Sequence, residues 1–88
     1  MNWAGATEKF CKRGPWIISS RGFRVRALGR AGMEYVEGGK SVHVDSEALT
    51  IPAFVVYAQS LPADARIGII DNLRRAWRSS GFDVQVQE

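Results

Sequence analysis

The sequence contains few of the residues from which disulfides and membrane spans are built. Its one cysteine, Cys11, cannot form an internal disulfide and is typical of a reducing compartment. The longest apolar run, residues 53–58, is far too short to cross a bilayer, so we predict no membrane contact. The N-terminal residues include Glu8 and Lys9 and lack an apolar stretch of signal-peptide length. We therefore expect a cytoplasmic protein.

Histidine is equally scarce, which bears on catalysis and metal binding. His43 is the only histidine, and Glu34 and Asp45 are its acidic neighbours in the predicted hairpin. A catalytic or metal site needs several groups that converge from different segments, and the chain offers neither a second histidine nor a cysteine pair. We predict that the protein is not an enzyme, that it holds no metal or cofactor, and that His43 faces solvent near Glu34.

The composition is that of one small globular domain. The chain has 88 residues, of which 45% are hydrophobic and 24% are charged. A domain of this length buries only roughly 60–65% of its unfolded surface, which leaves little room for a deep active site. Residues 1–14 show no sustained period and predict an irregular arm, and residues 15–18 predict either a first short strand or an arm against the sheet. We predict a single domain over residues 1–88, with residues 1–20 as an irregular N-terminal extension.

Alternation predicts the first clear strand at residues 23–27. Phe23 and Val25 point one way while Arg24 and Arg26 point the other, as in a strand with one buried face. Because the aromatic residue of this strand lies on the face opposite the arginines, we expect the arginines to lack a platform on which bases could stack. In the register that places Val25 beside Tyr35, Arg26 faces Glu34.

A glycine pair predicts a hairpin after this strand. Gly38-Gly39 supplies the positive φ angles that a two-residue turn needs, and residues 33–37 and 40–44 flank it. Such a turn fixes the register of the two strands. The predicted facing pairs are Tyr35 with Val42, Met33 with Val44, and Glu34 with His43.

The C-terminal half predicts a strand, a helix and a last strand. Residues 50–58 are nearly continuously apolar, and residues 65–80 form an amphipathic helix that Asp64 or Ser60 caps and Gly81 ends. The apolar stripe of that helix consists of Ile67, Ile69, Ile70, Leu73, Ala76 and Trp77. Phe82 then contacts Trp77, and residues 82–87 alternate as a strand parallel to the apolar one. The predicted fold class is α+β, an antiparallel β-meander with one amphipathic helix packed on the sheet and a C-terminal strand.

Charge is unevenly distributed along the chain. Residues 1–30 carry seven basic residues and one acidic residue, whereas residues 31–60 carry one basic and four acidic residues. The chain as a whole has a net charge of +3. Such polarity steers an oppositely charged protein or a nucleic acid and does not choose between them.

One pattern of residues extends from the end of the predicted hairpin to the end of the predicted helix. Its members are Ser46-Glu47, Val56-Tyr57, Ser60-Leu61, Arg66, Ile69-Ile70, Asp71-Asn72-Leu73 and Gly81. The pattern resembles a family of small bacterial immunity proteins that are encoded beside polymorphic toxins, including contact-dependent growth inhibition toxins, and that bind the toxin domain. The resemblance covers residues 21–88. It departs from the family at Pro62-Ala63-Asp64, where an aromatic residue often stands, so a partner contact through that aromatic is not expected here.

The resemblance implies a protein that neutralises the C-terminal domain of a cognate toxin in the producing cell or in a sibling cell. The predicted partner-binding residues are Glu34, Glu37, Asp45, Glu47 and Arg66. The four carboxylates are the only acidic concentration in the chain, and Arg66 stands at a helix start, where the helix dipole disfavours a cation. Arg66 therefore pairs with Glu47 or reaches the partner. Two alternatives stay open: a small nucleic-acid-binding module that uses the Arg-rich face, and a small enzyme subunit or regulatory domain.

Overall fold

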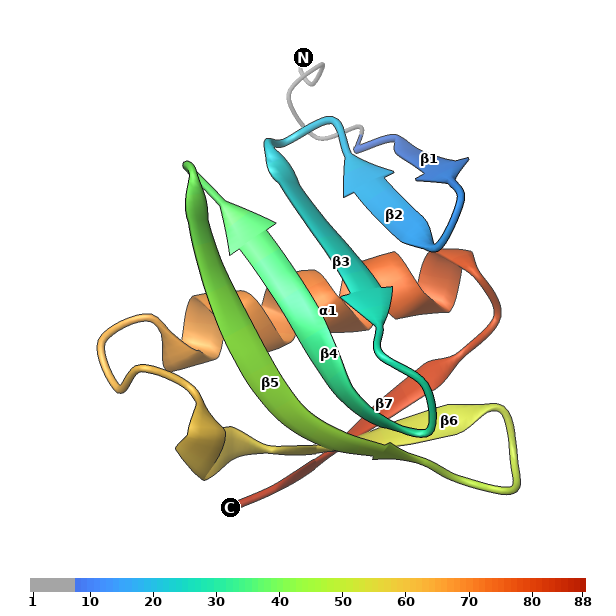
Figure 1. The fold of residues 1–88 in the computed structure, drawn as a ribbon, viewed down its shortest axis with the longest axis vertical. Helices are drawn as coiled ribbons and strands as arrows, with labels where there is room; N and C mark the ends of the chain where they lie inside the picture. Colours follow the sequence, from blue (N-terminus) through green and yellow to red (C-terminus); the bar gives the residue numbers. More distant parts are fainter. Residues whose placement is uncertain (1–7) are drawn as a thin grey trace, which may run out of the picture.

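A computed structural model describes residues 8–88, which form one curled sheet and one α-helix (Figure 1). The strands are β1 (Phe10–Arg13), β2 (Trp16–Ser19), β3 (Phe23–Ala27), β4 (Ala31–Glu37), β5 (Lys40–Ala48), β6 (Ala53–Tyr57) and β7 (Asp83–Gln87). They lie in the sheet in the order of the sequence, and every neighbouring pair is antiparallel except β6 and β7, which are parallel. The short 3-10 helix η2 (Ala58–Ser60) and the helix α1 (Arg66–Ser79) connect β6 to β7. The predicted α+β meander with a C-terminal strand is confirmed.

The central hairpin has the predicted register. Gly38 and Gly39 adopt φ angles of 60° and 79°, which residues with a Cβ atom rarely adopt. Tyr35 faces Val42, and the other predicted pairs of β4 with β5, Met33 with Val44 and Glu34 with His43, are also present. Arg26 faces Glu34 across β3 and β4, as alternation predicted.

The N-terminal segment is more regular than the sequence indicated. β1 and β2 form a hairpin that extends the sheet beyond β3, so the prediction of an irregular extension over residues 1–20 is wrong for residues 10–13 and 16–19. Of the two alternatives for residues 15–18, the short strand is present. β1 has apolar contact on one side only: Phe10 packs edge-on against Phe23 with ring centroids 6.4 Å apart, while the other three residues are exposed. Because only Phe10 of these four residues is partly shielded from solvent, the sequence of β1 shows no alternation of apolar and polar residues. Residues 1–7, for which an irregular arm was also predicted, lie outside the described residues.

β6 is shorter than the predicted apolar strand. It begins at Ala53, directly after Pro52, and gives way to η2 after Tyr57. Proline lacks the N–H that a ladder requires, which fits its place just before the strand. Ser60 does not cap α1: its hydroxyl donates to the carbonyl of Tyr57 at 2.8 Å and accepts the amide of Asp45 at 3.0 Å.

Helix α1 covers one face of the sheet and supplies a large part of the core. Its buried residues are Ile69, Leu73, Ala76 and Trp77. These positions repeat at intervals of four, three and one, which is a single stripe on a helix. Ile67 lies off that stripe and is 86% exposed, so its predicted core position is wrong. Within residues 8–88, no helix is long and apolar enough to span a membrane.

The two ends of α1 differ in how they are closed. Ala65 is the N-cap and makes no side-chain cap bond, so the predicted cap by Asp64 is wrong. At the other end Gly81 has a φ of 86°, and the amide of Phe82 donates to the carbonyl of Trp77 at 3.0 Å. The rings of Phe82 and Trp77 lie 5.8 Å apart, edge to face. This is the Schellman ending with its hydrophobic contact that the sequence predicted.

Two truncations on α1 test the position of the apolar stripe. Leu73 is fully buried, so Leu73→Ala should lower the free energy of unfolding by about 2–5 kcal/mol through lost burial and a residual cavity. Ile67→Ala removes a side chain that is 86% exposed and should change it by less than about 0.5 kcal/mol. Urea unfolding of dilute protein, followed by circular dichroism, measures both. Equal losses for the two variants would contradict this packing of the helix.

Candidate functional site

The face of the sheet opposite α1 carries most of the charged side chains of the strands. In β2 to β5 the residues that point toward α1 are largely buried, and those that alternate with them are exposed or half-buried. Figure 1 shows α1 behind β3, β4 and β5, with their opposite face toward the viewer. We call this surface the open face. It consists of Arg13, Trp16, Ile18, Arg24, Arg26, Glu34, Val36, Ser41, His43, Asp45, Glu47 and Tyr57.

One end of the open face is basic and contains an aromatic ring. The guanidinium groups of Arg24 and Arg26 lie 4.6 Å and 4.9 Å from the ring centroid of Trp16, as cation–π pairs. Arg26 also forms a salt bridge of 2.7 Å with Glu34. The expectation that these arginines have no aromatic neighbour on their own face is wrong, because Trp16 comes from the adjacent strand β2 rather than from β3.

Glu34 stands between the basic and acidic ends. Its carboxylate accepts hydrogen bonds from Ser41 at 2.8 Å and from Arg26 at 2.9 Å. These two bonds, with the positive charge of Arg26 and Arg24, lower the pKa of Glu34 despite some burial. Glu34 is thus held ionised by groups within the protein.

The other end of the open face is acidic and lies along β5. His43 Nδ1 is 3.4 Å from the carboxylate of Asp45, and both side chains are 63% exposed. Glu47 accepts a hydrogen bond of 2.5 Å from the Tyr57 hydroxyl. That bond, burial and the charge of Glu47 raise the pKa of Tyr57, so the hydroxyl keeps its proton. Asp45 is the carboxylate of this end that is most open to a partner.

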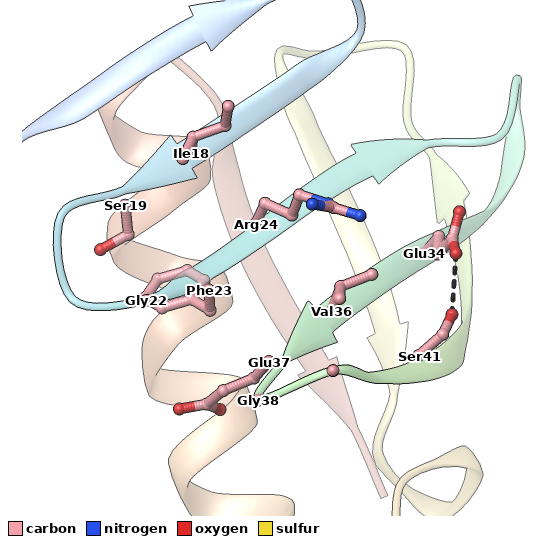
Figure 2. A pocket seen from close by; sticks show the side chains of 11 residues that line it. Ile18, Ser19, Gly22, Phe23, Arg24, Glu34, Val36, Glu37, Gly38 and Ser41 are labelled. Carbon is pink, nitrogen blue, oxygen red and sulfur yellow. Dashed lines mark hydrogen bonds between the residues drawn. The ribbon is translucent and has the colours of Figure 1, made fainter.

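Two shallow hollows mark the open face. The larger, of about 530 Å³, lies over β2 to β5 and includes Arg24, Glu34, Val36 and Ser41 in its lining (Figure 2). The second, of about 310 Å³, is lined by Ala31, Gly32, His43, Asp45, Ser46 and Tyr57. Gly32 has a φ of 87°, and a Cβ atom there would come within 3.1 Å of the His43 ring. Both hollows are open enough to receive side chains of another protein.

The structure brings three of the five predicted partner-binding residues to one surface. Glu34, Asp45 and Glu47 lie on the open face, as their exposure and strand positions show. Glu37 shares the strand parity of Tyr35 and accepts the Tyr35 hydroxyl at 2.5 Å, so it lies toward α1. Arg66 donates to the carbonyl of Leu61 at 3.1 Å. The predicted alternative in which Arg66 pairs with Glu47 is wrong, because Arg66 folds back on the loop before α1.

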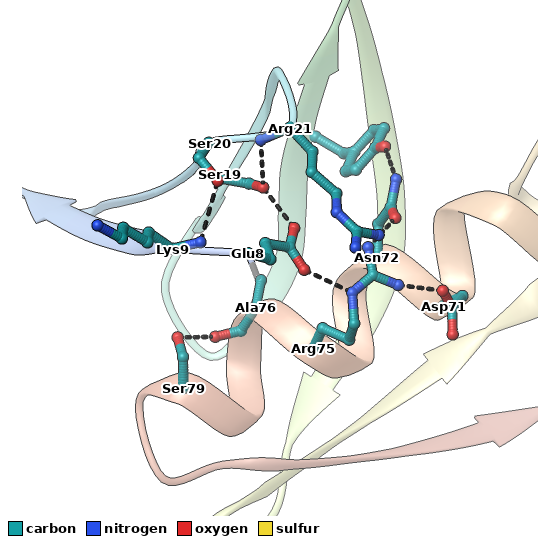
Figure 3. A network of polar contacts seen from close by, with 11 residues as sticks. Glu8, Lys9, Ser19, Ser20, Arg21, Asp71, Asn72, Arg75, Ala76 and Ser79 are labelled. Carbon is teal, nitrogen blue, oxygen red and sulfur yellow. Dashed lines mark hydrogen bonds and ion pairs between the residues drawn. The ribbon is translucent and has the colours of Figure 1, made fainter. Parts of the chain in front are cut away.

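A polar network on the helix side joins the first described residue to α1 and β4 (Figure 3). Arg75 donates through Nε to Glu8 at 2.6 Å and also contacts Asp71 and Asn72. Asn72 in turn donates to the Tyr35 hydroxyl at 2.7 Å. The side chain of Glu8 is only 6% exposed. No signal in the sequence indicated this pair, because its partners are 67 residues apart.

Glu8 is held as a carboxylate by its partners. Burial alone raises its pKa, but hydrogen bonds from Arg75 and Ser19 and the charges of Arg75 and Arg21 outweigh that effect and lower it. Burial, the Glu37 hydrogen bond and the Glu37 charge raise the pKa of Tyr35, although the bond from Asn72 opposes them. The network therefore keeps Glu8 ionised and the Tyr35 phenol protonated.

The residues that carry the resemblance mostly hold the scaffold. Ser60 ties η2 to β5, Asn72 ties α1 to Tyr35, and Gly81 ends the helix. Ser46 is buried in β5. Of this set, Glu47 and Tyr57 are the members that reach the open face. The motif thus explains the fold better than it marks an interface.

Among residues 8–88, no three His, Cys, Asp or Glu side chains gather in a way that could hold a metal ion. No family model, curated protein or solved structure matches the chain.

The two carboxylates on Arg75 give a test of the polar network. Glu8→Gln should lower the free energy of unfolding at pH 7 by about 1–3 kcal/mol, because it weakens a charge-assisted bond to a nearly buried group. Asp71→Asn, at a side chain that is 68% exposed, should cost less than about 1 kcal/mol. Urea unfolding at several pH values measures both.

The pH dependence follows from the lowered pKa of Glu8. A carboxyl group whose pKa is lower in the folded state contributes its full stability above the unfolded value of 4.5 and loses it as pH falls through the folded value. The difference between wild type and Glu8→Gln should therefore shrink below about pH 4.5. A difference that stays constant to low pH would show that the ion pair contributes nothing.

Proposed function

We propose that this protein is an immunity protein that binds the C-terminal domain of a cognate bacterial toxin and neutralises it in the cytoplasm. The resemblance of residues 46–81 supports the class of partner. The observation that carries the proposal is the open face, a sheet surface with ordered charge and two shallow hollows that no other element of residues 8–88 covers. Inhibition would come from an interface of standard size, about 800 Å² on each partner.

The acidic end of the open face is the part we propose to meet the toxin first. Toxin domains that attack nucleic acid are often basic, and opposite charge both accelerates encounter and covers a basic substrate site. Asp45 is exposed, and within residues 8–88 His43 is the one charged partner of its side chain, so its charge is available. Glu34 and Glu47 have internal partners and act as the fixed surroundings of Asp45.

Asp45→Lys tests this docking surface. The toxin is the C-terminal domain of the large exported protein that the gene directly upstream should encode. Co-expression of wild type should restore growth of cells that make this domain, and Asp45→Lys should weaken binding at least about tenfold, or roughly 1.4 kcal/mol. Growth assays and titration calorimetry measure the two effects.

Asp64→Lys is the matched control, because it makes the same charge change at an exposed position before α1. It should leave toxin binding within about twofold of wild type, since long-range effects of single exposed charges are screened. Soluble wild type that fails to rescue growth would refute the immunity assignment. Rescue that Asp64→Lys abolishes and Asp45→Lys does not would place the interface on the helix side.

The basic end of the open face favours one second candidate, a nucleic-acid-binding module. Arg13, Arg24 and Arg26 share this end with the half-buried Trp16, and arginines and aromatic rings are the groups that contact phosphates and stack on bases. Two features argue against it. Arg26 is paired with Glu34, and the ring of Trp16 is already in contact with the guanidinium groups of Arg24 and Arg26.

Salt dependence distinguishes the two functions. We expect only weak binding of generic RNA or DNA at physiological salt, because Arg26 is paired with Glu34 and the carboxylates of β5 on the same face repel phosphates. Fluorescence anisotropy with a labelled single strand, over a range of salt concentrations, measures this. Submicromolar binding at physiological salt that Arg24→Glu with Arg26→Glu abolishes would favour the nucleic-acid module.

A further inference from the structure

The two edges of the sheet are protected to different degrees. Among residues 8–88, β1 and β7 each pair with one neighbour only. An unpaired edge offers N–H and C=O groups to a strand of another chain, and proteins usually block it with short length, lysine, proline or a bulge. β1 has four residues and includes Lys12 and Arg13. β7 (Asp83–Gln87) has no basic residue and no proline, and its pairing with β6 is regular throughout.

The backbone of β7 presents its valines to the free edge. The amide of Asp83 donates to the carbonyl of Pro52 at 3.0 Å, so the backbone polar groups of Asp83 point toward the β6 side. These groups alternate in direction along a strand. Val84 and Val86 therefore direct their N–H and C=O groups away from β6, where a further strand would bind them.

Helix α1 provides apolar surface beside this edge. Ile67 is 86% exposed, the highest value among the large hydrophobic side chains of residues 8–88. With Ile70 and Val86 it lines a hollow of about 310 Å³ between α1 and β7, which Asp71, Arg74 and Glu88 complete. A strand added to β7 would place its inward side chains on Ile67 and Ile70. The exposed side chain of Ile67 would thus gain an apolar contact without any change in the fold.

We propose that β7 pairs antiparallel with β7 of a second copy of this chain, about a two-fold axis at Gln85. The strand is complementary to itself in this register: Val84 faces Val86 of the second copy, and Asp83 faces its Gln87. Val84 and Val86 would then exchange backbone hydrogen bonds, which agrees with the direction of their polar groups. No two like charges face each other, and both copies use the same patch, as a two-fold interface requires. The inference is independent of the proposed toxin binding.

Val86→Pro tests the edge directly. Proline is tolerated on an edge strand where its missing N–H would face solvent, so the variant should keep its fold by circular dichroism. Wild type should sediment with a mass near twice 9.8 kDa at high concentration, and Val86→Pro should remain at 9.8 kDa. Sedimentation velocity over a range of protein concentrations measures both masses.

Two lysine substitutions test the register, and they also serve if Val86→Pro fails to fold. Gln85→Lys places two ammonium groups opposite each other on the two-fold axis and should weaken the dimer roughly fivefold. Gln87→Lys, two residues further on, places lysine opposite Asp83 of the second copy and should leave the dimer as tight or tighter. Both side chains are exposed in the single chain, so neither change disturbs the core.

Three results would overturn the proposal. Wild type that stays monomeric at every concentration excludes the dimer. If Gln85→Lys and Gln87→Lys weaken the dimer equally, or if neither weakens it, the dimer uses another register or another surface. A monomeric wild type whose toxin binding Val86→Pro abolishes would show that the edge takes a strand of the toxin instead. Toxin rescue by a monomeric wild type would leave the proposed function standing while this inference fails.

Discussion

The packing of Trp77 on the sheet is the contact on which the arrangement of the molecule depends. Its indole lies 4.5 Å from the ring of Phe54 in β6, and its Nε1 donates to the sulfur of Met33 in β4 at 3.2 Å. It also touches Phe82, which leads into β7. One side chain thus holds α1 against three parts of the sheet. Because α1 packs on this face, no helix of residues 8–88 covers the opposite face of β3 to β5, and the charged side chains of these strands lie mostly there.

Much of the fold could be predicted because its signals are local. Alternation identifies β3, the Gly38-Gly39 pair fixes the β4–β5 register, and Gly81 ends α1, each through a constraint that acts within a few residues. The predicted apolar stripe of α1 included one exposed residue, because helical periodicity alone does not show which side of an apolar stripe contacts the sheet. Ile67 lies off the buried stripe of α1 and is exposed for this reason.

The features that could not be predicted depend on contacts outside the element concerned. β1 has one apolar contact, so it joins the sheet through its hairpin with β2 rather than through a pattern of its own. Trp16 reaches Arg24 and Arg26 only because of the β2–β3 register, and no turn signal as strong as a glycine pair specifies that register. The same holds for the candidate site. The four carboxylates were chosen because they are concentrated in the sequence, and strand parity was not applied to them. Parity brings Glu34, Asp45 and Glu47 to one face and places Glu37 on the other.

The two faces of the sheet satisfy their charges in different ways, and the difference bears on function. On the helix side Glu8, Arg75 and Asn72 are tied to one another and to Tyr35, so a change at one of them leaves a partly buried partner unsatisfied. On the open face Asp45 is well exposed and its pair with His43 is long, and such surface pairs contribute little to stability. Folding therefore constrains the residues of the inner network closely and the exposed pair of His43 and Asp45 only weakly. We propose that this exposed charge, which the fold does not require, serves to recognise a partner.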